Sequence, residues 1–304
     1  MDKLKAMEAL IKVVDTGSFT RAAELLGTPK ATVSTLIQEL ETQLGVRLLH
    51  RTTRKVTVTV DGAAYYERCI RLIDDLREAD ESVSSRQGSP GGRLRVDVPT
   101  SLGSLLMYAG LSDFMARYPK ISLELGCSDR LVDMVSEGVD CVIRVGEVND
   151  PSLAARRIGS MRLLTCAAPA YLAARGEPQH PNDLVSHQWI SYFLSHQPGR
   201  VLPVDFGKDG QRIELSLPGA LALNDSNVHE DAVRAGLGIG QLPSYALCCP
   251  DKAGELVEVL PGWTSDPMPV FVLYPSNRHL STRVQAFVEW VAEFFERTPG
   301  LRRV

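Results

Sequence analysis

The first sixty residues carry apolar positions at helical spacing, with a glycine where the pattern breaks. Ala23, Gly27 and Val33 show an Ala-x3-Gly-x5-Val spacing, which suits two helices that cross at a tight turn. Ala23 adds little bulk where the helices touch, and Gly27 can adopt the positive φ of the turn. Leu36 and Ile37 extend the apolar face of the second helix. The pattern predicts a helix-turn-helix, a motif typical of proteins that read DNA.

The flanking residues favour the same interpretation. Thr28 suits the N-cap and Pro29 the first position of the second helix. Beyond that helix, two short strand-like runs at residues 46–49 and 56–59 enclose a basic connection, which predicts a wing whose cations contact phosphates or enter the minor groove. The alternative is a helical hairpin in another kind of core with a solvated charge run. Turn, cap and basic hairpin together favour a winged helix-turn-helix DNA-binding domain over residues 1–60.

A second periodic stretch follows the wing. Thr59 can cap a new helix, with Asp61 placed in its first turn. Apolar side chains then alternate at spacings of four and three, which is the pattern of a coiled-coil seam; they are Tyr65, Cys69, Leu72, Leu76, Ala79 and Val83. We expect a linker helix over residues 61–88 that pairs two chains. The alternative is that the stripe packs on its own domain.

From residue 93 the pattern changes to short apolar runs that alternate with amphipathic stretches. The runs predict strands at residues 94–98, 121–125, 141–145, 163–167, 239–242 and 270–274. The amphipathic stretches predict helices at residues 101–117, 130–137, 169–174, 226–235 and 281–295. This order indicates an α/β domain with a largely parallel sheet. We expect two lobes over residues 89–304, lobe I at about 93–163 and 268–304 and lobe II at about 164–267, with a ligand cleft between them.

The two parts of the chain differ in net charge. The 304 residues have a net charge of −4, but residues 1–60 hold nine basic and six acidic residues, or +3, which leaves −7 for the remainder. A mildly basic head on an acidic body suits a DNA reader with a separate module. No apolar run approaches 18 residues and no signal-peptide pattern opens the chain, so we expect a cytoplasmic protein without membrane contacts.

Motifs for catalysis and metal binding are missing from the sequence. The six cysteines fit no zinc spacing, and GxSxG, HExxH and P-loop motifs do not occur, so we expect no catalytic residues, no metal and no cofactor. Gly236, Gly238 and Gly240 follow a predicted helix and precede a strand, the reverse of a dinucleotide fingerprint, and predict a tight turn. The lone His229 is expected on a helix surface. The adjacent Cys248 and Cys249 are expected to be structural thiols rather than redox sensors.

Several segments together resemble the LysR-type transcriptional regulators. In the head the resemblance rests on GSFTRAAELLG, ATVSTLIQELETQLGVRLLHRT and TVDG. In the body it rests on LVDMVSEGVDCVIRVGE, LAARRIG, CAAPAYLAARG, AVRAGLGIGQLP and LYPSNRHLSTRVQAFVEW. The segments occur in order along essentially the whole chain. The resemblance implies a periplasmic-binding-protein-like, two-lobed effector domain behind the winged helix-turn-helix and its linker helix.

The resemblance also implies partners. The protein would be a homotetramer, built as a dimer of dimers, that binds double-stranded DNA at an interrupted inverted repeat. A small-molecule co-inducer, whose identity the sequence does not reveal, would bind between the lobes and change the placement of the DNA-binding heads. RNA polymerase would be a further partner.

The candidate DNA contacts are Ser18, Thr20, Lys30, Ala31, Ser34, Thr35 and Arg54, and the resemblance assigns all of them except Ser18 and Thr20. Lys30 can donate to guanine acceptors, and Ala31 or the Thr35 methyl group can touch a thymine methyl. Ser18 and Thr20 lie at the start of the first motif helix, where hydroxyl and N–H groups can hold a phosphate. Family members commonly have Gln and Arg where this chain has Lys30 and Thr35, so their site preference does not transfer.

Candidate effector contacts lie where strands end and helices begin; they are Thr100, Ser101, Cys127, Ser128, Arg144, Asn224 and Ser226. Hydroxyls, helix N-termini and one arginine predict a small anionic or polar effector. Arg144 can instead pair internally with Asp129 or Asp97, and Cys127 can be a structural thiol.

Two other functions are consistent with parts of the sequence. A solute-binding protein would share the two-lobed body, but the DNA-reading head and the missing signal peptide argue against it. An enzyme with a fused regulatory head would need a nucleophile–base pair or a metal cluster, and the sequence offers neither. A ligand-responsive transcription factor is therefore the leading hypothesis.

Overall fold

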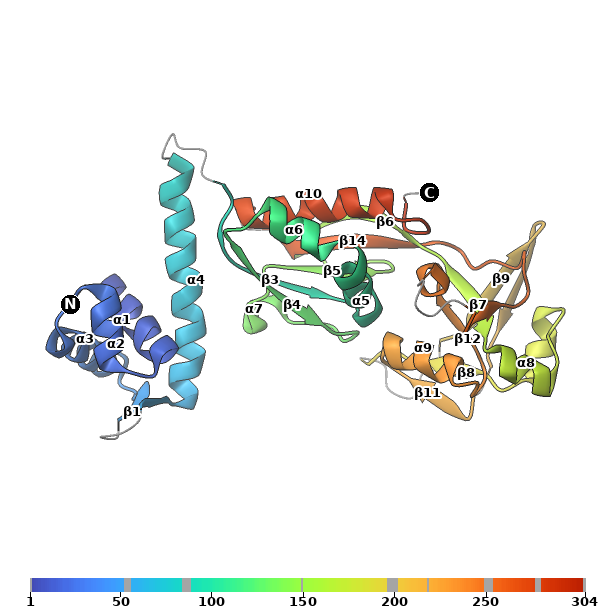
Figure 1. The fold of residues 1–304 in the computed structure, drawn as a ribbon, viewed down its shortest axis with the longest axis horizontal. Coiled ribbons are helices and arrows are strands. Elements are labelled where there is room, and N and C mark those ends of the chain that lie inside the picture. The colour runs from blue at the N-terminus through green and yellow to red at the C-terminus, as the bar shows by residue number, and fades with distance from the viewer. Residues whose placement is uncertain are drawn as a thin grey trace. The chain divides into compact units, whose positions relative to one another are not determined.

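A computed structural model describes residues 2–51, 56–83, 89–148, 150–195, 202–217, 219–248, 254–276 and 280–302. The chain forms two compact units, Met1–Ser89 and Pro90–Val304. Figure 1 shows the helices of the first unit in blue and the α/β elements of the second in green to red. Each unit has its own buried core.

The first unit opens with three helices, α1 (Lys3–Thr16), α2 (Phe19–Leu26) and α3 (Lys30–Leu44). Each ends at a glycine in the left-handed conformation, with φ of 61° at Gly17, 59° at Gly27 and 71° at Gly45. An L side chain adopts this conformation only at a cost, so glycine sets the helix ends. The helix-turn-helix predicted around Gly27 is therefore present.

The predicted start of α3 was wrong in detail. Thr28 does not cap the helix, because its hydroxyl donates to the Leu26 carbonyl at 3.1 Å and so serves the preceding turn. Pro29 is the capping residue, with extended backbone and no side-chain hydrogen bond to the helix, and Lys30 is the first helical residue.

The wing is a two-stranded ribbon of β1 (Leu49–Arg51) and β2 (Val56–Val58), paired antiparallel. A buried carboxylate fixes its position against the recognition helix: Glu41 on α3 accepts hydrogen bonds from the N–H groups of Leu48 and Leu49, at 2.9 and 3.1 Å. The predicted basic connection at residues 52–55 lies outside the described residues.

Helix α4 (Val60–Val83) begins as predicted, because the Thr59 hydroxyl accepts a hydrogen bond from the Gly62 N–H at 2.8 Å. The predicted seam, however, is divided. Tyr65 and Cys69 pack into the core of the first unit, where burial raises the pKa of the Cys69 thiol to about 11.

The remaining described seam residues face solvent. Leu72 is 52% exposed and Leu76 is 41% exposed. Ile73, which is not part of the predicted seam, is buried in the core of the first unit. The side chains of Ala79 and Val83 lie outside the described residues. The prediction that all these residues form one seam is therefore wrong for Tyr65 and Cys69. One apolar face of α4 packs against its own domain, and a second apolar face is exposed at Leu72 and Leu76.

The second unit begins with a five-stranded sheet in the order β4-β3-β5-β14-β6. The strands are β3 (Gly92–Val98), β4 (Ile121–Cys127), β5 (Cys141–Val145), β6 (Leu153–Met161) and β14 (Met268–Pro275). β3 pairs parallel with β4 and β5, but β14 is antiparallel to both β5 and β6. β3, β4, β5 and β6 therefore run in the same direction and β14 alone is reversed, so the sheet is largely parallel as predicted, with one antiparallel strand that returns from the other lobe.

Helices cover this sheet; they are α5 (Thr100–Ala109), α6 (Leu111–Arg117), α7 (Met134–Glu137) and α10 (Thr282–Arg297). One predicted helix, residues 101–117, is broken at Gly110. A Cβ at Gly110 would lie 2.6 Å from the ring of Phe294 on α10, so the break allows the backbone to approach that ring. Another, residues 130–137, is shortened to α7, which Asp133 caps.

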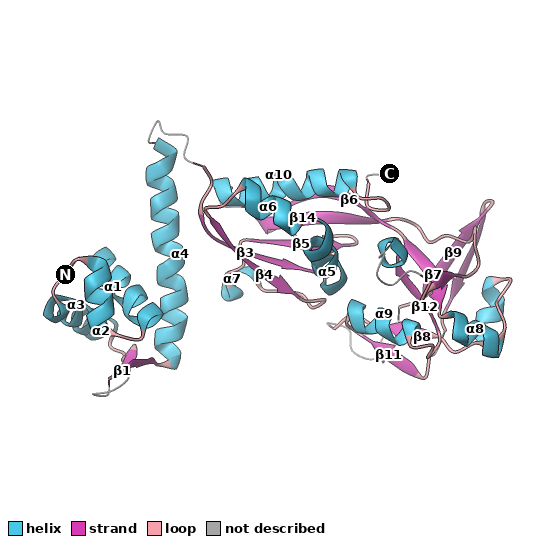
Figure 2. Ribbon diagram, viewed as in Figure 1, coloured by secondary structure: helices cyan, strands magenta, loops and turns pink. Residues whose placement is uncertain are grey.

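Lobe II is built from shorter elements (Figure 2). They are β7 (Leu163–Ala167), α8 (Pro169–Arg175), η1 (Pro181–Ser186), β8 (Ile190–Tyr192), β9 (Val204–Lys208), β10 (Gln211–Leu215), β11 (Leu221–Leu223), α9 (Ser226–Arg234), β12 (Ile239–Pro243), η2 (Ser244–Cys248) and β13 (Val257–Glu258). β7 lies between β12 and β13 and is antiparallel to both. Gly236 has a φ of 74° just after α9, which confirms the predicted helix-to-strand turn.

Strand β6 leads directly into β7, with Arg162 as the one residue between them, so the chain passes from lobe I to lobe II without a loop. The chain returns to lobe I at β14. None of the helices described is at once long and apolar enough to cross a membrane.

We predict that Gly62→Ala destabilises the first unit by about 1–3 kcal/mol or more. A Cβ at Gly62 would lie 1.9 Å from the carbonyl oxygen of Leu48, so helix and wing would have to separate. Thermal unfolding followed by circular dichroism measures the effect, with the exposed Ala64→Ser on the same helix as control. Equal melting of the two variants would contradict this account.

Candidate DNA-binding and effector sites

The front of α3 is open to solvent. Lys30, Ala31 and Thr35 are exposed, and Ser34 is half-buried. The Thr35 hydroxyl donates to the Ala31 carbonyl at 3.0 Å. Its hydrogen is therefore used within the helix, which leaves its methyl group and oxygen lone pairs for a partner. The four predicted base-reading residues thus lie in the first two turns of one helix.

The two hydroxyl residues of the other motif helix have different roles. Ser18 is the N-cap of α2, and its hydroxyl accepts from the Arg21 N–H at 3.4 Å. Thr20 is exposed in the first turn of the same helix. Arg54, the predicted wing contact, lies outside the described residues.

In the second unit, the structure brings together residues from the two lobes at the N-terminal ends of α5 and α9. Asp129, which follows β4, accepts hydrogen bonds from both helices: Thr100 N–H donates to Oδ1 at 3.0 Å, and Ser226 N–H donates to Oδ2 at 2.6 Å. Thr100 belongs to lobe I and Ser226 to lobe II. One carboxylate therefore links the starts of two helices in different lobes.

Further hydrogen bonds cross the same junction. The Ser101 N–H donates to the Ser226 hydroxyl at 3.0 Å, and the Thr100 hydroxyl donates to Asp225 at 3.2 Å. Asn227 Nδ2 donates to the Ser104 hydroxyl at 3.0 Å. Among the predicted effector residues, Thr100, Ser101 and Ser226 are therefore brought into direct contact at the lobe junction.

Tyr245 adds a buried contact behind the junction. Its hydroxyl lies 2.8 Å from that of Ser101, and both residues are buried. Burial raises the pKa of the Tyr245 phenol well above its ordinary value. Tyr245 and the bridging role of Asp129 were not predicted, because neither residue lies near these helix starts in the sequence.

Arg144 has an internal partner. Its guanidinium lies 2.6 Å from the Asp97 carboxylate, with both side chains largely buried, and it also donates to the Ile143 and Arg130 carbonyls. Burial raises the pKa of Asp97, while the hydrogen bond and charge of Arg144 oppose that rise. Of the two partners considered for an internal pair, the structure has Asp97 rather than Asp129, so the cation that suggested an acidic effector is already neutralised.

The other three predicted effector residues lie beside the junction without bridging it. The Ser128 hydroxyl accepts from the Arg130 N–H, and Asn224 Nδ2 donates to the Ser195 hydroxyl at 3.1 Å. Cys127 is exposed at the end of β4. Partial burial and the nearby charges of Asp97 and Asp129 raise the pKa of the Cys127 thiol, which disfavours the reactive thiolate.

His229 was expected on a helix surface, and that prediction was wrong. It is only 3% exposed, and Nε2 lies 3.0 Å from the Ile190 carbonyl oxygen. Burial lowers the pKa of the imidazole below its ordinary value. A Cβ at Gly240 would lie 3.1 Å from the ring, so the close approach of strand β12 depends on a glycine there.

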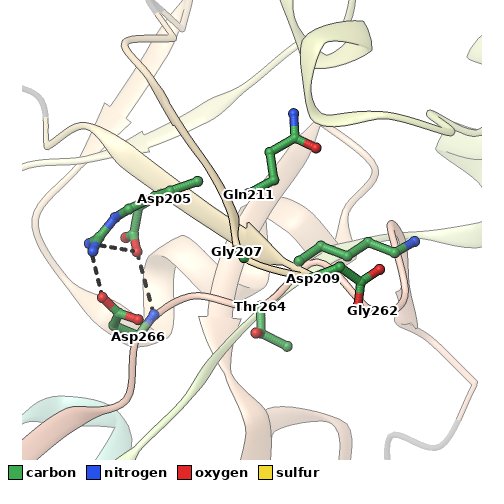
Figure 3. A pocket seen from close by; sticks show the side chains of 10 residues that line it. Asp205, Gly207, Asp209, Gln211, Gly262, Thr264 and Asp266 are labelled. Carbon is green, nitrogen blue, oxygen red and sulfur yellow. Dashed lines mark hydrogen bonds and ion pairs between the residues drawn. The ribbon is translucent and has the colours of Figure 1, made fainter.

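A separate hollow of about 560 Å³ lies on the β9–β10 hairpin of lobe II (Figure 3). Arg212 pairs with Asp266 at 2.9 Å and with Asp205 at 3.6 Å along its edge. The hollow includes none of the predicted effector residues, and its Arg212 is already paired with two carboxylates. We therefore place the candidate effector site at the α5–α9 junction. Within the described residues, no group of three or more His, Cys, Asp or Glu side chains could hold a metal ion.

Comparison with protein families identifies both units. Residues 4–63 match the bacterial regulatory helix-turn-helix protein, lysR family, and residues 87–296 match the LysR substrate binding domain. An HTH-type transcriptional repressor of Pseudomonas aeruginosa is 40% identical over 99% of this chain and 95% of its own length. The HTH-type transcriptional activator AaeR of Escherichia coli is 32% identical over 97% and 94%.

Solved structures show the same architecture. The LysR-type regulator CrgA of Neisseria meningitidis matches with a TM-score of 0.61 and 30% identity, over 95% of this chain and 98% of its own. The full-length virulence activator AphB of Vibrio cholerae matches with a TM-score of 0.57 and 32% identity, over 95% and 98%. The two-lobed α/β fold predicted behind a helix-turn-helix is confirmed.

We predict that Arg144→Gln destabilises the protein by about 3–5 kcal/mol, because it leaves the buried Asp97 carboxylate without its cation. The double variant Asp97→Asn/Arg144→Gln should recover most of that loss. The loss of unfolding free energy in Arg144→Gln should become smaller as the pH falls. The Asp97 carboxyl has a raised pKa in the folded state, so it takes up a proton there more readily than in the unfolded chain.

Urea unfolding of the wild type and the variants at neutral and acid pH measures these differences. If the double variant is as unstable as the single variant, the pair is not the reason for the loss.

Proposed function

Because this chain belongs to the LysR family of transcriptional regulators, we propose that it controls transcription from an inverted-repeat DNA site in response to a small polar or anionic metabolite. The family combines a DNA-binding helix-turn-helix with an effector-binding domain, and both are present here. The proposal includes a cytoplasmic location and no enzymatic activity, in keeping with relatives that are named as regulators.

The exposed front of α3 is the observation that carries the proposal for DNA. Lys30 supplies a positive charge there, and Ala31 and Thr35 supply small apolar groups, which together suit the edges of guanine and thymine in the major groove. Ser18 and Thr20 at the start of α2, and Arg54 in the wing, would hold the phosphate backbone.

The junction of α5 and α9 is the proposed effector site. It offers hydroxyl, amide and backbone groups from both lobes within hydrogen-bonding distance of one another. A ligand bound there would touch both lobes at once and so would favour one arrangement of them over another. We propose a small-molecule co-inducer with polar groups and no additional cofactor.

The exposed stripe on α4 supports assembly. Leu72 and Leu76 are one helical turn apart and face solvent, although α4 uses its other apolar face for its own domain. We propose that this stripe pairs two chains, that two such pairs form a tetramer, and that RNA polymerase is a further partner. Two recognition helices would then face the two halves of an inverted repeat.

Footprinting on the DNA upstream of the protein's own gene, at two salt concentrations, tests the proposal. We expect protection of two half-sites related by two-fold symmetry, weakening steeply as salt rises because phosphate neutralisation releases counterions. Protection that is insensitive to salt, or its absence both with and without candidate metabolites, would contradict the proposal.

We predict that Lys30→Ala relaxes the base preference at one position of each half-site, at a cost of about 1–3 kcal/mol there. Binding titrations against a set of single-base variants of the site measure this. Lys5→Ala, which removes an equal charge from α1, is the control and should leave base preference unchanged. If Lys30→Ala weakens binding equally on all sequences, Lys30 contacts only the backbone.

We predict that Leu76→Asp lowers the fraction of chains that are paired, because a charge in the apolar stripe would have to be desolvated in the paired state. Sedimentation or light scattering gives the mass in solution. Val60→Asp is the matched control, since Val60 is an apolar residue of the same helix and 90% exposed, but lies outside the stripe. An unchanged mass for Leu76→Asp would reject pairing through α4.

A further inference from the structure

The carboxylate of Asp129 lies where two helices of different lobes begin. It follows β4 in lobe I and is half-buried. Its Oδ1 accepts from the first residue of α5 and its Oδ2 from the first residue of α9, at 3.0 and 2.6 Å. A carboxylate normally caps one helix of its own segment, as Asp225 does for α9. Asp129 instead caps two helices that belong to separate lobes.

The negative charge of Asp129 stabilises the approach of these two helix N-termini. Each helix N-terminus carries the equivalent of about half a positive charge, so bringing two of them together is unfavourable without an anion between them. Asp129 supplies that negative charge. Its field also reaches Tyr192 of lobe II, where burial, followed by the charge of Asp129, raises the pKa of the phenol.

The other charges near the junction are also negative or already paired. The Asp225 carboxylate accepts from the Thr100 hydroxyl and from two N–H groups of its own helix. Arg144 is paired with Asp97, and Arg130 with Glu137. An incoming carboxylate would therefore meet helix N-termini that are already neutralised and carboxylates that repel it.

We propose that Asp129 is the internal counterion that holds the two lobes together and that it excludes small carboxylates from this junction. The inference rests on the proposed effector function and narrows the effector to one that presents hydrogen-bond donors, such as hydroxyl, amide or ammonium groups, to this junction. Asp129 is thus the residue that determines which chemical class of effector can bind at the α5–α9 junction.

Substitution of Asp129 by alanine, followed by addition of formate, tests this inference in the full-length protein. The Asp129→Ala variant should melt about 4–8 °C below wild type, because the Thr100 and Ser226 N–H groups lose their acceptor. Formate should restore part of this loss, since a free carboxylate can take the vacated place, and the recovery should grow with its concentration. Wild type should show no such recovery.

Two further variants control the experiment. Asp133→Ala removes a carboxylate that caps α7 by two N–H groups within lobe I alone, so formate should not stabilise it more than wild type. Asp129→Asn removes the charge but keeps the volume, so it should lose stability without recovery by formate. The same formate titration on all four proteins cancels the general effect of salt.

Recovery confined to Asp129→Ala supports the inference. Wild-type stability in Asp129→Ala, or equal stabilisation of all four proteins by formate, overturns it. If Asp129→Ala does not fold, Asp129→Asn still decides: a melting temperature as high as that of wild type refutes the role of the charge, and a clear loss supports it. Because no DNA is used, failure here leaves the footprinting test of the proposed function intact.

Discussion

Backbone N–H groups without an acceptor in their own helix or strand ladder need one from another element, and in this protein carboxylates supply several of these acceptors. Glu41 on α3 accepts from the chain that enters the wing, Asp140 accepts from the Arg95 N–H of β3, and Asp129 accepts from two helices in different lobes. Each contact joins one element to another and replaces water at a group that is costly to bury unpaired. The same requirement therefore acts at the wing, in the first sheet and at the lobe junction.

Local sequence predicted those features that depend on neighbouring residues. The turn at Gly27 and the cap at Thr59 follow from the conformational freedom of glycine and the reach of a hydroxyl, and both are present. The break at Gly110 could not be predicted, because its cause is the ring of Phe294, which is distant in sequence. The same holds for Arg144: its type and position suggested a ligand contact, but only the fold shows that Asp97 lies beside it.

Helix α4 shows why a seven-residue pattern alone is ambiguous. Adjacent residues on a helix point about 100° apart, so Ile73 can be buried in the head while Leu72 faces solvent. The sequence reveals that both are apolar but not which face each occupies. Folding of the head therefore uses positions adjacent to, but separate from, the exposed Leu72 and Leu76 that we propose for pairing.

The link between Glu41 and the wing has a mechanical consequence. Because Glu41 belongs to α3 and its carboxylate holds the N–H groups of Leu48 and Leu49, the recognition helix and the ribbon move as one rigid lever. The head therefore presents the helix and the ribbon at a fixed separation, so in the function we propose, an effector would act on the spacing between heads rather than within one head.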